Sequence, residues 1–258
     1  MLDNVPIVRI YKEGKGKQKS MKDMVAAEYA LTITLDKEEL VTLLCSPEKP
    51  EYLAVGFLCS EGLIKGKGDI GEIVLDEKKG LIEITTEGRV HLPDETVSQR
   101  LIGSSGGRGI SFHASDQHKI ESKRTISPSE IFILVEKFLH QSKLYKATGG
   151  VHSAALCDTR HILVFSEDIG RHNAIDKVFG ECLLKAQPTD DHIVITSGRV
   201  SSEIVNKVVK RNIPILISKS APTNRGIEQA ADLGITLIGF VREERMNLYT
   251  HTRRVVSD

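Results

Sequence analysis

The residues best suited to chemistry lie together in the stretch 167–180, which reads EDIGRHNAIDKVFG. An apolar run at 161–165 precedes it, and a helix-like run follows to about Lys185. The turn between the two runs is crowded with polar side chains: Asp168, Arg171, His172 and Asn173. The N–H groups and dipole of a helix N-terminus attract anions, and an arginine fork matches phosphate. The stretch therefore predicts an anion site, with a simple capped helix start as the alternative.

His172 is the best candidate in the chain for acid–base chemistry. Its imidazole titrates near neutral pH when unperturbed, and Asp168 or Asp176 is predicted to orient the ring. The spacing of His172 and Asp176 also fits an ordinary surface pair one helical turn apart. A metal-dependent hydrolase that uses these two residues is a separate hypothesis, although the spacing of His, Cys, Asp and Glu predicts no metal site.

Four segments share one form, in which an apolar strand ends and small or charged polar residues follow: 168–173, 197–202, 220–223 and 242–245. In a parallel sheet such segments meet at one edge, where α/β folds place their ligands. The candidate contacts are arginines, small hydroxyls and glycines that admit close backbone approach: Arg171, Arg199, Arg242, Arg245, Ser197, Ser201, Ser220, Thr223, Gly170 and Gly198. They predict a pocket for a bulky anionic ligand such as a nucleotide. Neither of the common glycine-rich phosphate loops occurs in the sequence.

The second half of the chain alternates between apolar strands and amphipathic helices. The strands are predicted at 151–157, 161–165, 192–196, 213–217 and 235–241. A helix from Ser127, with a capping box and a proline at its first position, is predicted to run to about Tyr145. This pattern is typical of an α/β fold with a mostly parallel sheet covered on both faces.

The first half predicts a smaller, strand-rich domain. Strand pairs at 29–35 with 40–45, and at 70–75 with 81–86, flank a helix at 51–64, and residues 1–24 are predicted to be a polar lead-in. The glycine-rich stretch 103–109 is either a flexible linker or a loop that closes over a ligand. We therefore expect an N-terminal domain over 1–120 and an α/β ligand-binding domain over 121–258.

Composition narrows the class of protein. The 35 basic and 35 acidic residues cancel, so no overall field recruits nucleic acid or a membrane surface. No apolar run reaches membrane-spanning length, and we expect a cytoplasmic protein. The four cysteines show no metal or disulfide spacing, and each lies in an apolar run that predicts a buried thiol: Cys45, Cys59, Cys157 and Cys182.

The sequence resembles the FdhD/NarQ family, the formate dehydrogenase accessory proteins. The matching stretches are LAVGFLCSEGLI at 53–64, TGGVHSAAL at 148–156, EDIGRHNAIDKVFG at 167–180, ITSGRVSSEIVNK at 195–207, SAPT at 220–223 and ITLIGFVREERMNLYT at 235–250. The resemblance implies a homodimer and a cytidine-deaminase-like three-layer α/β/α domain with a mostly parallel mixed sheet. It also implies a sulfurtransferase role in molybdenum cofactor biosynthesis. Such a sulfur carrier takes sulfur from a cysteine desulfurase and passes it to Mo-bis(molybdopterin guanine dinucleotide) before the cofactor enters formate dehydrogenase.

The resemblance also assigns binding residues. Its cofactor-binding stretch is Phe240, Val241, Arg242, Glu243, Glu244 and Arg245. A guanine nucleotide is expected to mimic part of the cofactor. The arginine-lined edge predicted above suits such a ligand.

One position departs from the family pattern. The family carries its sulfur on a cysteine in the flexible loop, where this chain has Ser105 and Gly106. Persulfide chemistry needs a thiolate, which neither residue supplies. The sequence therefore leaves two hypotheses for the family role: a sulfur carrier, or a chaperone that binds the cofactor without sulfurtransferase activity.

Overall fold

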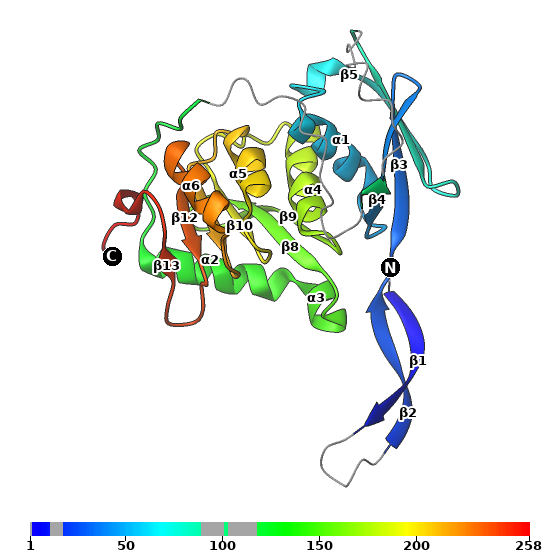
Figure 1. Cartoon of the computed structure of the whole chain (residues 1–258), viewed down its shortest axis with the longest axis horizontal. Helices are drawn as coiled ribbons and strands as arrows, with labels where there is room; N and C mark the ends of the chain where they lie inside the picture. Colours follow the sequence, from blue (N-terminus) through cyan, green and yellow to red (C-terminus); the bar gives the residue numbers. More distant parts are fainter. Residues whose placement is uncertain (1, 11–17, 89–100, 103–117) are drawn as a thin grey trace.

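The computed structural model describes residues 2–10, 18–88, 101–102 and 118–258. Two sheets and a protruding hairpin make up the strands of these ranges (Figure 1). The predicted glycine-rich stretch 103–109, with Ser105 and Gly106, lies outside the described residues. The domain boundary at residue 120 stays a prediction.

The protruding hairpin consists of β1 (Leu2–Ile10) and β2 (Gln18–Ala26), paired antiparallel from Leu2 opposite Ala26. It extends away from the rest of the chain as a separate arm (Figure 1). The prediction of a polar lead-in over residues 1–24 therefore missed the two strands in the described part of that segment. Few apolar residues alternate along it, so the sequence pattern gave little sign of strands.

The five-stranded sheet has the order β5-β6-β3-β4-β7. Its strands are β3 (Tyr29–Leu35), β4 (Glu38–Cys45), β5 (Ile70–Asp76), β6 (Leu81–Thr86) and β7 (Leu101–Ile102). The helix α1 (Pro50–Glu61) packs its buried side chains on this sheet and ends at Gly62, whose φ of 85° suits a residue without a Cβ. The short 3₁₀ turn Lys67–Asp69 leads into β5. Both predicted hairpins and the predicted helix are confirmed.

The six-stranded sheet has the order β13-β12-β11-β10-β8-β9. Its strands are β8 (His152–Cys157), β9 (Ile162–Asp168), β10 (Ile193–Thr196), β11 (Ile215–Ser218), β12 (Thr236–Gly239) and β13 (Asn247–Leu248). Only β10–β11 and β11–β12 pair in parallel, and the other three pairs are antiparallel. The prediction of a mixed sheet is therefore confirmed, whereas the expectation that most of its strands pair in parallel is wrong. A tight turn joins β8 to β9, and such a turn can only connect antiparallel strands.

Helices cover both faces of the six-stranded sheet. On one face lies α2 (Pro128–Gln141), and on the other lie α4 (Arg171–Leu184), α5 (Ser202–Val209) and α6 (Asn224–Asp232) (Figure 1). The predicted three layers are present, whereas the likeness to cytidine deaminases stays a prediction. The capping box at Ser127 is confirmed, but the predicted single helix breaks at Ser142 and continues as α3 (Lys143–Thr148). Near the end of the chain, Thr252–Arg254 forms a 3₁₀ turn.

The two sheets are joined through a close crossing of α1 and α4, which lie side by side in Figure 1. Each helix has a glycine at the crossing: a Cβ on Gly56 would lie 1.8 Å from the carbonyl oxygen of Asp176, and one on Gly180 would lie 1.9 Å from that of Tyr52. Such an approach is possible only without side chains at these two positions. None of the helices in the described ranges combines the length and apolar character needed to span a bilayer.

Candidate functional site

The four predicted polar segments lie at one edge of the six-stranded sheet. The strands β9, β10, β11 and β12 run in the same direction, since β9 and β10 are both antiparallel to β8 and β10–β12 are mutually parallel. Their carboxyl ends therefore share an edge. Because β8 runs the opposite way, its first residue, His152, lies at this edge too.

A cavity of about 550 Å³ opens at this edge. It lies between the strand ends and the α2–α3 connection, with glycines, hydroxyls, aromatic rings and two cations in its lining: Leu139, Ser142, Tyr145, Gly149, Gly150, Val151, His152, Ser153, Ile169, Ser197, Lys219, Ser220, Ala221, Phe240 and Arg242. Ser197 is held in place, since its Oγ accepts the N–H of Ser153 (2.9 Å) and lies 3.3 Å from Nδ1 of His152. A cavity of this size and mixed lining is typical of small-ligand sites.

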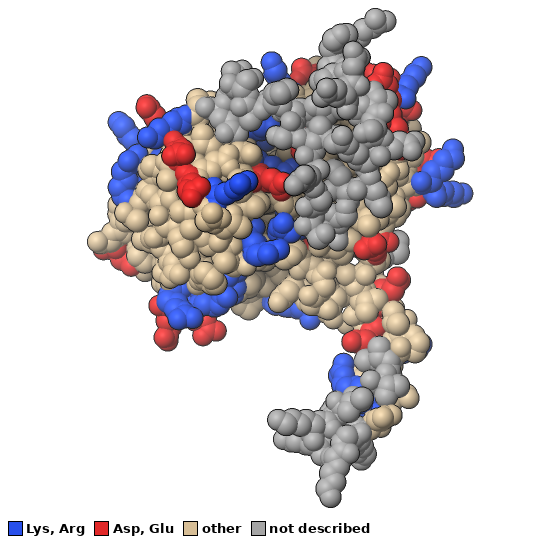
Figure 2. Space-filling view, viewed as in Figure 1, with Lys and Arg blue, Asp and Glu red and all other residues tan. Residues whose placement is uncertain are grey.

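A second cavity of about 1000 Å³ adjoins the first. It is bounded by α2 and by the loop between β12 and β13: Phe132, Ile133, Val135, Glu136, Leu139, His140, Lys146, Lys219, Arg242, Glu243, Glu244 and Arg245. The loop side chains are exposed, and Figure 2 shows basic and acidic side chains next to each other at lower left, where Figure 1 places this loop. Leu139, Lys219 and Arg242 line both cavities.

Phe240 is held in an uncommon backbone conformation beside the smaller cavity. Its φ is 52°, a left-handed value that a bulky residue adopts at some cost. Its N–H donates to the carbonyl of Ser220 (3.2 Å), and the N–H of Val241 donates to that of Ser218 (3.3 Å). These bonds turn the chain so that Phe240 stays 39% exposed while Val241 is buried. An exposed ring held rigidly in this way can stack on a planar ligand group.

Arg171 and Arg199 form a separate basic cluster on the same edge. Arg171 packs closely on the turn after β10. A Cβ added to Gly198 in that turn would lie only 2.7 Å from the Cβ of Arg171. Burial and the neighbouring charge of Arg199 lower the pKa of Arg171. Burial and the same two arginines lower the pKa of His152, which is therefore neutral at pH 7. Both arginines lie near His152, which lines the smaller cavity, but neither arginine is part of the described lining.

His172 is not oriented by Asp168 or Asp176, and this prediction is wrong. Both carboxylates are bonded to other groups: Asp176 pairs with Lys207 (2.6 Å) and accepts from Ser60 (2.6 Å). The Nε2 atom of His172 instead lies 3.5 Å from Oε2 of Glu203. Burial lowers the pKa of His172 to about 3, so the ring is neutral and does not act as a cation.

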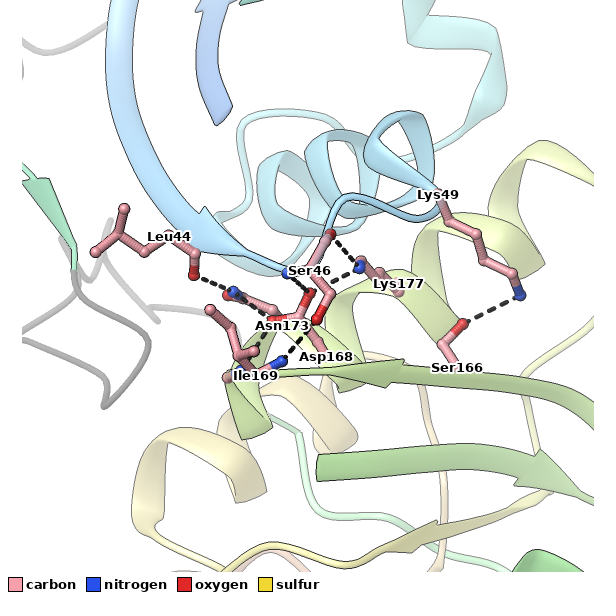
Figure 3. Close-up of polar contacts among 9 residues, drawn as sticks. Leu44, Ser46, Lys49, Ser166, Asp168, Ile169, Asn173 and Lys177 are labelled. Carbon is pink, nitrogen blue, oxygen red and sulfur yellow. Dashed lines mark hydrogen bonds and ion pairs between the residues drawn. The ribbon is translucent and has the colours of Figure 1, made fainter. Parts of the chain in front are cut away.

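Asp168 and Asn173 join the two sheets rather than line a cavity (Figure 3). The fully buried Asp168 pairs with Lys177 (2.7 Å) and accepts the N–H groups of Ser46 (3.0 Å) and Gly170 (2.8 Å). The side-chain amide of Asn173 donates to Asp168 (3.0 Å) and to the carbonyl of Leu44 (3.0 Å). These contacts tie the end of β4 to the turn between β9 and α4. The internal partners occupy both side chains, which the sequence assigned to a ligand.

The other predicted site residues divide between the cavities and the helix ends. Ser197, Ser220, Phe240 and Arg242 meet at the smaller cavity, and Glu243, Glu244 and Arg245 join Arg242 at the larger one. Thr223 caps α6 by accepting the N–H of Gly226 (3.1 Å), while Ser201 stands at the N-cap position of α5. Gly198 has no Cβ and therefore leaves room for the side chain of Arg171.

Sequence reasoning missed several residues that line the cavities. Lys219 follows β11 directly and has the same position at a strand end as the arginines, so the pattern could have included it. His152, the first residue of β8, also lines the smaller cavity. Phe132, Leu139 and Tyr145 come from the α2–α3 segment, and no local signal in the sequence relates them to the strand ends.

All four cysteines of the chain fall within the described residues, and all are buried with free thiols. Burial raises the pKa of Cys45 and of Cys182 to about 12, and raises that of Cys157 as well. Such thiols are poor nucleophiles. No group of three or more His, Cys, Asp or Glu side chains able to hold a metal occurs among the described residues.

Comparisons with known proteins agree over nearly the whole chain. The model of the FdhD/NarQ family matches residues 26–256. "Sulfur carrier protein FdhD" of Bacillus subtilis (strain 168) is 40% identical over 260 residues, covering 99% of this chain and 99% of the relative. The protein of the same name from Listeria innocua is 38% identical over 260 residues, covering 98% and 100%. The structure described as "Crystal structure of a putative formate dehydrogenase accessory protein from Desulfotalea psychrophila" matches with a TM-score of 0.79 at 27% identity, covering 99% of each chain.

Proposed function

The chain belongs to the FdhD/NarQ family, and on this premise we propose that it is a formate dehydrogenase accessory protein that binds Mo-bis(molybdopterin guanine dinucleotide). The observation that supports this proposal is the meeting of cations and exposed rings at the two adjoining cavities. The cofactor is a large anion with planar ring systems joined by diphosphate. Arginine and lysine suit its phosphates, and an aromatic face suits its rings.

The first test uses GDP as a probe and measures its affinity by calorimetry. Arg242→Ala should weaken GDP binding about tenfold, since a hydrogen bond between a guanidinium and a phosphate is worth about 1.5 kcal/mol or more. Arg171→Ala should weaken it less, because Arg171 lines neither cavity. Arg160→Ala is the control, since this exposed arginine lies in the turn between β8 and β9, at the opposite edge. Failure of the wild-type protein to bind any guanine nucleotide would count against the proposal.

A second candidate is a cofactor-binding chaperone that transfers no sulfur. The burial of all four thiols favours it, because a sulfur carrier needs a thiolate that its donor can reach. The pKa of about 12 for Cys45 and Cys182 keeps both as thiols at neutral pH. The loop positions Ser105 and Gly106 supply no thiol either.

The two candidates differ in a persulfide-labelling experiment. The chain is incubated with a cysteine desulfurase and cysteine, and persulfides are located by mass spectrometry. The wild type should remain unlabelled, while Gly106→Cys should be labelled at position 106. A labelled native cysteine would exclude the chaperone candidate in favour of the sulfur carrier.

Complementation tests the role in cells. A strain lacking its own accessory protein is supplied with the wild type or with Gly106→Cys, and formate dehydrogenase activity is measured. Restoration by the wild type indicates that formate dehydrogenase is the client. Restoration only by Gly106→Cys indicates that sulfur transfer is the missing step. We also propose a homodimer and a cytoplasmic location, which light scattering and cell fractionation test directly.

A further inference from the structure

Lys219 occupies the junction between the two cavities. It follows β11, and among the described residues it lines both the 550 Å³ and the 1000 Å³ space together with Leu139 and Arg242. Residues common to both linings place the spaces next to each other. A ligand longer than either cavity would therefore pass beside Lys219 and Arg242.

The main chain of Lys219 holds Arg242 in place. Nη1 of Arg242 donates to the carbonyl of Lys219 (2.5 Å) and to that of Val241 (2.9 Å). Both bonds use the same nitrogen, so within the described residues they leave the Nε and Nη2 donors for a ligand. The fork is thus anchored at one end and presents its other donors at the junction.

Two positive charges are therefore held near each other at the junction. Lys219 is half-buried, and burial followed by the charge of Arg242 lowers its pKa, while Glu243 opposes the shift. Like charges in a partly buried setting repel, and a bound anion relieves the repulsion. A diphosphate has the charge and the length to contact an ammonium and a guanidinium at once.

We propose that Lys219 and Arg242 together bind the diphosphate of a ligand whose two ring systems occupy the two cavities, and that Lys219 makes the site prefer a diphosphate over a monophosphate. This inference rests on the proposed function and assigns to Lys219 a role in it. The guanine ring lies in the larger cavity, beside Phe132 and the carboxylates of Glu243 and Glu244. Guanine presents N1–H and N2–H donors that a carboxylate accepts as a pair, whereas adenine does not. The other ring system then meets Phe240 in the smaller cavity.

The test compares the affinities of GDP, GMP and guanosine by calorimetry for the full chain and its variants. The wild type should prefer GDP to GMP. Lys219→Met should lower GDP affinity about tenfold or more, bring GDP close to GMP, and leave guanosine within about twofold. Lys219→Arg should keep the preference for GDP. Lys123→Met is the matched control, since Lys123 is exposed, lines neither cavity and should change the GDP-to-GMP ratio by less than about twofold.

The outcomes separate this inference from the proposed function. Wild-type binding of GDP that Lys219→Met leaves unchanged would overturn the role of Lys219 alone. An equal loss of GDP and guanosine in that variant would do the same, because it would show a structural effect. Absence of any guanine-nucleotide binding to the wild type would overturn both proposals. Unchanged guanosine affinity also reports that the variant is folded.

Discussion

Replacing Lys177 with methionine should destabilise the protein strongly. The Lys177 side chain is 1% exposed, and its Nζ lies 2.7 Å from the fully buried carboxylate of Asp168 and 2.9 Å from the carbonyl of Ser46. Methionine fills most of the same space but brings no charge. The substitution therefore leaves the Asp168 carboxylate buried without its counter-ion.

The size of the loss follows from the contacts that remain. Breaking a buried ion pair from one side typically costs about 3–5 kcal/mol. Asp168 still accepts N–H groups from Ser46, Gly170 and Asn173, so we expect the lower end of the range, about 3 kcal/mol. For a chain of this size this corresponds to a fall in Tm of roughly 6–12 °C.

Thermal and urea unfolding of the variant measure the loss, with Lys123→Met as the control at an exposed position. The double variant Asp168→Asn with Lys177→Met removes both charges and should recover at least about 1.5 kcal/mol relative to Lys177→Met alone. If Lys177→Met lowers Tm by less than about 2 °C, the reasoning is refuted. A double variant no more stable than the single one would show that the loss comes from packing and not from the unpaired charge.

The remaining predictions concern pH and the helix crossing. The pKa of His172, lowered to about 3, means that below pH 6.5 the unfolded chain binds a proton that the folded chain does not. The contribution of neutral, buried His172 to the free energy of unfolding is complete above pH 6.5 and should fall by about 2 kcal/mol between pH 6.5 and 5. In urea-unfolding experiments over this pH range, His172→Gln should remove most of that pH dependence. Gly180→Ala should cost roughly 1–3 kcal/mol, because its Cβ would lie 1.9 Å from the carbonyl of Tyr52. Gly66→Ala, where a Cβ meets nothing within 4 Å, should stay within about 0.5 kcal/mol by the same measurement, and equal effects of the two would contradict the crossing argument.

Local signals in the sequence predicted the elements well. The hairpin of β3 and β4 followed from apolar strands around a charged turn, and the start of α2 followed from the capping box at Ser127 and Glu130. Each of these signals acts between residues a few positions apart. The sequence also predicted that the polar residues after β9, β10, β11 and β12 lie at one edge of the sheet. This requires only that these four strands run in the same direction.

Strand direction in β8 could not be predicted from the same pattern. Buried strands read as apolar runs whichever way they point, and only the tight turn between β8 and β9 sets the antiparallel pairing. This reversal brings His152 to the cavity edge.

The sequence alone determined the family, the order of the elements and the set of polar residues at the strand ends. Only the tertiary structure decided which of them line a cavity. Asp168 and Asn173 turn inward because the end of β4 docks on their turn. Lys219 and Arg242 line the larger cavity because α2 packs on the sheet beside them and supplies the other wall. The physical reason is that propensity and capping act over a few residues, whereas docking depends on contacts between segments more than a hundred residues apart in the chain.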